Sequence, residues 1–142
     1  MIAARSVART LALVATITAT IGPAAGQGPR KLHFRVLNTL VDVAAALETC
    51  WLANEPPLAQ SRPGMNVTVM LNFTRTGEIF GEPRFTYITR EATPETKALY
   101  QRAVVAALDA CTPLPFSPAL GNALAGIPKV MPFIDRRNEK GI

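Results

Sequence analysis

The chain has few residues that could hold a metal ion or a phosphate group. Its 142 residues include one histidine, His33, and two cysteines, Cys50 and Cys111. No CxxC, HxxH or HExxH spacing occurs, and the isolated glycines form no phosphate-binding loop. The usual metal and nucleotide motifs are therefore excluded, and we expect neither a metal nor a cofactor.

Catalytic groups are also sparse. Ser61 and Ser117 lie in proline-rich segments outside any GxSxG setting. Ten acidic residues are spread along expected helix and loop surfaces: Asp42, Glu48, Glu55, Glu78, Glu82, Glu91, Glu95, Asp109, Asp135 and Glu139. We predict that the protein is not an enzyme, with a site built from dispersed carboxylates as the alternative.

Positive charge is modest and scattered. The net charge is +5, and aromatic residues make up 6% of the chain. No stripe of Lys and Arg interleaves with aromatic residues, as a nucleic-acid surface requires. We therefore expect no nucleic-acid partner.

The first 26 residues have the layout of a secretory signal peptide. Arg5 and Arg9 precede an uncharged apolar stretch, and Ala24 and Gly26 supply small residues for a cleavage site. The stretch contains four threonines, which suits a membrane-spanning helix of about 20 apolar residues poorly. We predict cleavage after residue 26 and export. A retained, membrane-anchoring segment is the alternative, and only then do we expect membrane contact.

Export changes what the two cysteines imply. In an oxidising compartment an even number of cysteines in a small domain favours a disulfide, and Cys50–Cys111 is the one intramolecular pairing. Closing a loop of about 60 residues stabilises a fold by roughly 4 kcal/mol in the chain-entropy model. Two separate buried thiols are the alternative.

Two amphipathic helices are predicted from apolar spacing. The first runs from about Phe34 to Trp51, and the second from a start at Thr93–Pro94 to Cys111. The apolar positions of the first are Leu37, Leu40, Val41, Ala44, Leu47 and Trp51. Three prolines after Cys111 end the second helix, and residues 121–127 read as a connector.

Three strands are predicted from alternation. They lie within residues 65–74, 79–89 and 127–134, with a turn at Gly77 between the first two. Pro132 places the third at an edge, because it lacks the donor that a central strand needs. The predicted fold is an α+β domain over residues 34–136, a three-stranded antiparallel sheet with two helices packed on one face. Residues 27–33 are expected to be an unstructured lead-in, and residues 137–142 a charged tail.

Several of these segments together resemble the C-terminal domain of the TolA and TonB envelope proteins. They are the CW pair at 50–51, the strand and turn at 63–79, the alanine-rich helix at 100–111, the Pro-Leu-Pro corner at 112–118 and the last strand, KVMPFI, at 129–134.

The resemblance implies a periplasmic protein-interaction domain of the Gram-negative envelope that works without a cofactor. Such domains take up segments of envelope proteins or peptides at an exposed sheet edge. Carried onto this sequence, the partner-binding residues are Val130, Met131 and Phe133. Only a short lead-in precedes the first helix, so a free-standing module is expected rather than one coupled to an inner-membrane motor. A small periplasmic enzyme or ligand-binding protein is the alternative.

Overall fold

A computed structural model describes residues 31–137. The predicted signal peptide, residues 27–30 of the lead-in and residues 138–142 of the tail lie outside the described residues. No helix within residues 31–137 is long and apolar enough to cross a membrane. The second prediction for residues 1–26, a membrane anchor, also falls outside this range.

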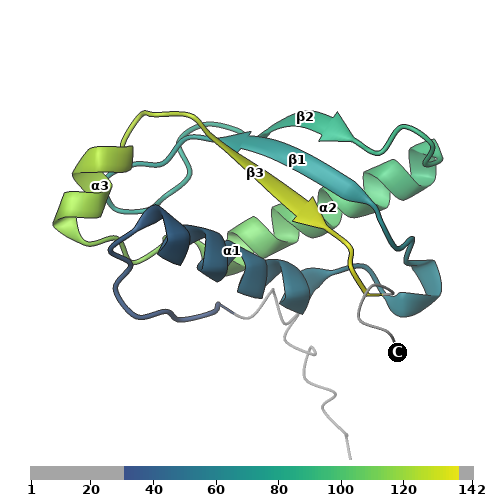
Figure 1. The fold of residues 1–142 in the computed structure, drawn as a ribbon, viewed down its shortest axis with the longest axis horizontal. Helices are drawn as coiled ribbons and strands as arrows, with labels where there is room; N and C mark the ends of the chain where they lie inside the picture. Colours follow the sequence, from purple (N-terminus) through teal and green to yellow (C-terminus); the bar gives the residue numbers. More distant parts are fainter. Residues whose placement is uncertain (1–30, 138–142) are drawn as a thin grey trace, which may run out of the picture.

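The described chain forms a sheet covered on one face by two helices (Figure 1). The strands are β1 (Asn66–Leu71), β2 (Arg84–Ile88) and β3 (Lys129–Ile134), in the antiparallel order β2-β1-β3. The helices are α1 (Leu40–Asn54) and α2 (Pro94–Cys111), with a short 3-10 helix η1 (Leu58–Gln60) and a further helix α3 (Pro118–Leu124). The predicted α+β class and helix–sheet arrangement are confirmed.

Each long helix starts at a side-chain cap. Thr39 and Asp42 form a capping box at α1: the Asp42 amide donates to Thr39 Oγ1 over 3.1 Å, and the Thr39 amide to Asp42 Oδ2 over 3.0 Å. At α2, Thr93 Oγ1 accepts from the Thr96 amide, and Pro94 occupies the first turn. The predicted start of α1 near Phe34 is therefore wrong, because the capping box sets it at Leu40.

The segment before α1 is extended and pairs with the proline corner. The Leu37 amide donates to the Pro115 carbonyl over 2.8 Å, and the Ser117 amide donates to the Leu37 carbonyl over 2.9 Å. Leu37 is buried, so its apolar character reflects this pairing rather than a helix face. Nearer the start, the Leu32 amide donates to the Ala110 carbonyl, and the Lys31 amine donates to the carbonyls of Asp109 and of Thr112, the C-cap residue of α2.

The helix α3 was not predicted. Residues 121–127 were interpreted as a connector, yet the chain is helical through Leu124. Ser117 accepts from the Leu120 amide and Pro118 follows it, which repeats the cap-and-proline start of α2. The same local signal was present at both places in the sequence.

The core lies between the sheet and the helix pair. Trp51, Tyr100 and Phe133 are fully buried there, with ring centroids of Trp51 6.2 Å from Tyr100 and 5.8 Å from Phe133. The predicted disulfide is present: Cys50 near the end of α1 is bonded to Cys111 at the end of α2, with Cα atoms 6.2 Å apart. It joins the two helices at neighbouring ends.

The turn after β1 depends on one glycine. Gly77 has φ +81, and a β-carbon there would overlap the backbone of Leu114. The Leu114 amide donates to the Gly77 carbonyl over 2.9 Å, so this turn also anchors the proline corner. Phe73 and Ile79 form an isolated bridge across the turn, and the second strand begins only at Arg84.

Loss of the disulfide will destabilise the fold without changing its topology. The loop closed by Cys50 and Cys111 spans 61 residues, for which the chain-entropy model gives about 4 kcal/mol. We expect the double replacement Cys50→Ala, Cys111→Ala to lower the free energy of unfolding by about that amount in urea titrations. Equal stability of the double variant and the oxidised wild type would contradict this account.

Candidate functional site

The predicted partner-binding residues all lie on β3, which is an edge of the sheet. Phe133 is buried and Met131 partly buried against the core, whereas Val130 faces outward with 59% of its surface exposed. The strand therefore brings the three residues together but divides their side chains between two faces. Among the three, Val130 is the side chain that the strand leaves most accessible.

The backbone of β3 has an alternating hydrogen-bond pattern. Its register with β1 is unbroken from Asn66↔Ile134 to Leu71↔Lys129. Just beyond the strand, the Asp135 amide donates to the Met65 carbonyl over 2.9 Å. Because antiparallel pairs alternate, Met131 and Phe133 also direct their amides toward β1, and Val130, Pro132 and Ile134 direct their backbone groups outward.

The outer edge of β3 is consequently an incomplete row of donors and acceptors. Pro132 has no amide to donate, and the Ile134 carbonyl accepts from Trp51 Nε1 over 2.9 Å. The outward groups that remain are the amide and carbonyl of Val130, the carbonyl of Pro132 and the amide of Ile134. Four groups on one regular strand can pair with an extended chain.

The other edge strand is less regular. The pairing of β2 with β1 shifts register between Thr68 and Val69, and β2 has only five residues. Bulges and short strands disfavour the addition of another strand. Of the two edges, β3 has the longer uninterrupted register.

A buried ionic cluster holds the end of β3. Asp135 is 0% exposed; the Tyr100 hydroxyl donates to its Oδ2 over 2.5 Å. Arg137 Nη2 donates to the same oxygen over 2.6 Å, and its Nε donates to Oδ1 over 2.9 Å. Arg137 also forms an ion pair with Glu55 at 3.2 Å, just beyond α1. This cluster joins the end of β3 to both long helices.

The cluster shifts the ionisation of its members. Burial and the hydrogen bond to Asp135 raise the pKa of Tyr100 to about 12. Burial acts to raise the pKa of Asp135, but the hydrogen bonds from Arg137 and Tyr100 outweigh it and hold that pKa below its usual value. Asp135 was expected on the surface with the other acids, and this interpretation is wrong because its partners bury it.

Two hollows lie between β3 and α1. One, of about 180 Å³, is lined by Ala44, Leu47 and Glu48 of α1 and by Met131 and its neighbours on the β3 side. The other, of about 110 Å³, is lined by Glu48, Leu52 and Glu55 on one side and by Ile134, Arg136 and Arg137 on the other. Glu48 and Arg136 line both, so the two hollows are neighbours.

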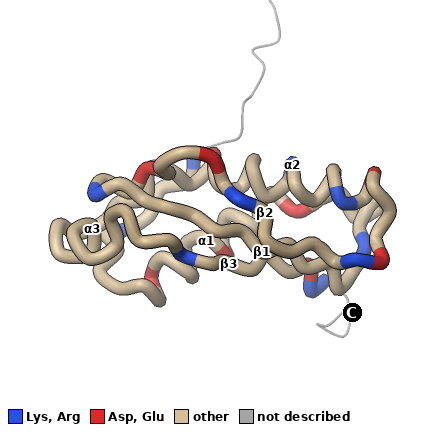
Figure 2. The backbone as a smooth tube through the Cα atoms, turned by 90° about the horizontal axis from the view of Figure 1, so that it is seen from above, with Lys and Arg blue, Asp and Glu red and all other residues tan. Residues whose placement is uncertain are grey.

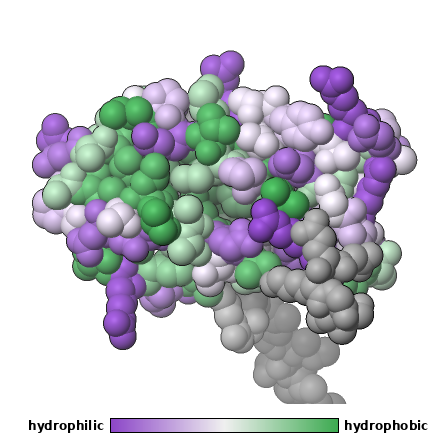
Figure 3. Space-filling model, in the orientation of Figure 1, coloured by the Kyte–Doolittle hydropathy of each residue, from purple (hydrophilic) through white to green (hydrophobic). Residues whose placement is uncertain are grey.

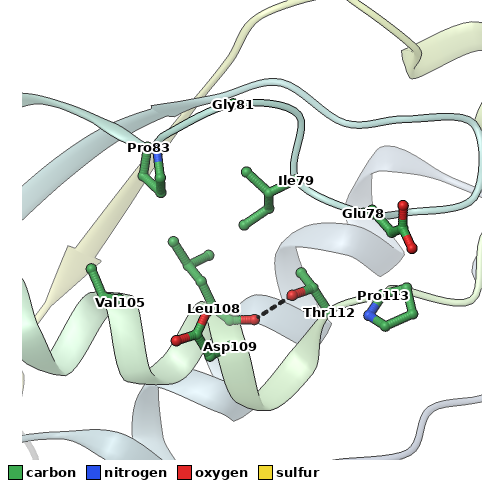
Figure 4. A pocket seen from close by; sticks show the side chains of 9 residues that line it. All are labelled: Glu78, Ile79, Gly81, Pro83, Val105, Leu108, Asp109, Thr112 and Pro113. Carbon is green, nitrogen blue, oxygen red and sulfur yellow. Dashed lines mark hydrogen bonds between the residues drawn. The ribbon is translucent and has the colours of Figure 1, made fainter.

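A separate groove of about 440 Å³ lies between α2 and the segment that leads into β2 (Figure 4). Its apolar lining includes Ile79, Val105 and Leu108, and the acidic residues Glu78 and Asp109 are also part of its lining. Both carboxylates are exposed, and within residues 31–137 neither makes a hydrogen bond or ion pair. The groove is a surface depression with a mixed polar and apolar lining.

Charge and hydropathy differ across the surface. Basic and acidic residues are interspersed along the backbone and do not gather in one stripe (Figure 2). Apolar side chains gather over α3 and the start of α1 (Figure 3). Large apolar residues are exposed at the start of α1, in the loop between α3 and β3 and at the start of β3: Leu40, Val41, Ile127 and Val130. Within the described residues no group of three or more His, Cys, Asp or Glu could hold a metal ion.

These features define a small disulfide-linked α+β domain with an open edge strand. The chain matches the family described as uncharacterised conserved protein UCP034077 over residues 33–137, and it belongs to that family. No curated protein and no solved structure gives a significant match.

Two proline substitutions will distinguish the outward and inward amides of β3. Met131→Pro removes an amide directed at β1 and leaves a buried carbonyl unpaired, so we expect it to lower the free energy of unfolding by about 1–3 kcal/mol or more. Val130→Pro removes an outward amide, and we expect a loss below about 1 kcal/mol. Urea unfolding of both variants measures this. Equal losses would contradict the assigned alternation.

The ionic cluster predicts destabilisation at both extremes of pH. The folded pKa of Asp135 lies below its unfolded value of about 3.9, so its contribution is complete above that pH and is lost as the pH falls further. The folded pKa of Tyr100, about 12, exceeds an unfolded value of about 10, so its contribution is lost as the pH rises between them.

We therefore expect the stability gap between wild type and Asp135→Asn to narrow as the pH falls below about 4. The gap between wild type and Tyr100→Phe will narrow between pH about 10 and about 12. Urea midpoints across pH measure both gaps. Stability gaps that stay constant across these pH ranges would contradict the proposed pKa shifts of Asp135 and Tyr100.

Proposed function

We propose that the protein is a non-catalytic binding module of the Gram-negative periplasm that takes up segments of other envelope proteins by strand addition to β3. The observation that carries this proposal is the outer edge of β3, where four backbone groups point away from β1 along an unbroken six-residue register. In the proposed complex, an extended partner segment satisfies these groups as a fourth strand.

The backbone of β3 is already ordered before a partner binds. Trp51 fixes the Ile134 carbonyl, and the Asp135 cluster ties the following residues to α1 and α2. A strand that is already ordered costs little further conformational entropy on binding. Pro132, which has no amide to donate, makes the same edge a poorer template for indiscriminate pairing.

Export is supported by two features. The N-terminal sequence has the layout of a signal peptide, and the Cys50–Cys111 disulfide is of a kind that persists in oxidising compartments. Periplasmic location is part of the proposal, as is cleavage after residue 26.

A link to Tol- or Ton-type envelope integrity or transport is also proposed. It rests on the resemblance of the quoted segments to the TolA and TonB C-terminal domain and on the order helix, strand, strand, helix, strand. The added helix α3 lies between the last two of these elements.

Strand addition is tested with linear peptides selected from a displayed random library on the chain from Gln27. We expect their affinity to fall at least about tenfold in Val130→Pro, which removes one edge donor and places a ring where the partner strand would lie. Val130→Thr keeps the amide and the β-branched shape, so it should bind within about twofold of wild type. Calorimetric titration measures both.

Selected peptides that bind Val130→Pro as tightly as wild type would exclude addition to β3. Circular dichroism of both variants establishes that each is folded before binding is compared.

A further inference from the structure

The helix α1 carries more apolar surface than the core uses. Its buried residues are Val43, Ala46, Leu47, Cys50 and Trp51. Leu40, Val41 and Ala44, which were expected to face the core, are exposed, and Leu52 is 51% exposed. Ala44, Glu48 and Leu52 are spaced by four residues and form one row along the helix; we call this row the α1 wall.

The α1 wall faces the outer edge of β3. Its three residues line the two neighbouring hollows, whose opposite side is formed by β3, Arg136 and Arg137. Figure 1 shows α1 and β3 running in the same general direction. Both hollows lie beside residues 131–134 and Arg136, and we call the two hollows together the seam.

We propose that the seam selects an extended partner segment with the pattern apolar, any, amide, any, apolar, in which the amide is Gln or Asn. This inference rests on strand addition to β3 and adds the side-chain chemistry of the partner. Alternate side chains of the added strand lie against the α1 wall, with the central amide between Glu48 and Arg136.

The spacing of the pattern follows from helix and strand geometry. Ala44 and Leu52 are eight residues apart, which is about 12 Å along a helix. Three alternate side chains of a strand, at positions i, i+2 and i+4, span about 13 Å along the strand. One side chain of the partner can thus meet each residue of the α1 wall.

The central amide follows from the two charges that line both hollows. Glu48 offers an acceptor and Arg136 offers donors, and within residues 31–137 neither makes a side-chain hydrogen bond or an ion pair. An amide side chain donates through its NH₂ group and accepts through its oxygen, so it can satisfy both groups at once. A lysine or a carboxylate would satisfy one and repel the other. The two outer positions meet Ala44 and Leu52, which favour apolar side chains.

The probe is the capped peptide Lys-Thr-Val-Thr-Gln-Thr-Val-Thr-Lys, whose inner side chains are Val, Gln and Val. Its binding to the chain from Gln27 is measured by calorimetry. Leu52→Asp should weaken binding at least about tenfold, because it places a charge against an apolar inner side chain. The matched control is Leu58→Asp: Leu58 is 74% exposed in η1 and is not among the residues that line the seam. It should bind within about twofold of wild type.

A second peptide tests the central position. Replacing its Gln by Glu keeps the size and the strand pattern but places a carboxylate beside Glu48, and we expect binding at least about fivefold weaker. Equal affinity of the two peptides, equal effects of the Leu52 and Leu58 variants, or no binding of the probe at about 1 mM would each overturn the proposed pattern.

Other occupants of the seam give distinct results. A dimer of the chain that Leu52→Asp abolishes and the probe does not displace would assign the seam to a second copy. A gain of more than about tenfold in probe affinity on deleting residues 138–142 would assign it to the chain's own end. If library-selected peptides bind Val130→Pro more weakly but bind Leu52→Asp as tightly as wild type, the proposed role of the seam is wrong and strand addition stands. If they bind Val130→Pro as tightly as wild type, strand addition itself is wrong.

Discussion

The position of β3 depends on the buried polar contacts at its carboxyl end. The Trp51 indole donates to the Ile134 carbonyl, and the fully buried Asp135 accepts from Tyr100 and Arg137. These contacts connect the last strand to both long helices, whose own ends are joined by the Cys50–Cys111 disulfide. An edge strand has only one neighbouring strand to hold it, so its fixed geometry relies on such contacts from outside the sheet.

The outer edge of β3 limits pairing with arbitrary strands but still leaves backbone groups open to a partner. Pro132 removes the central outward donor and Trp51 occupies one acceptor, which limits pairing with arbitrary strands. The amide and carbonyl of Val130 remain, and the residues that follow it line a hollow whose other side is α1. An edge with few backbone groups gains little affinity from the ladder alone. Side-chain contacts with α1 then become the natural source of selectivity in the proposed complex.

Local signals in the sequence account for most of the fold. The alternation of β1, the start of α2 at Thr93–Pro94 and the pairing of the cysteines could all be read from residue type and spacing. The start of α1 was missed because Leu37 continues the helical period, although Thr39 with Asp42 is a capping box. The start of α3 was missed although Ser117–Pro118 repeats the start of α2.

The environment of Asp135 could not be read in this way. Its partner Tyr100 is 35 residues away, and Arg137 Nη1 reaches the Pro56 carbonyl across 81 residues, so only the folded chain brings them together.

The most direct measurement of the central claim is amide hydrogen exchange along β3 with and without a bound peptide. The account predicts that Val130 and Ile134 exchange faster than Met131 and Phe133 in the free protein and become protected on binding. Unchanged exchange at Val130 and Ile134 in the saturated complex would contradict it.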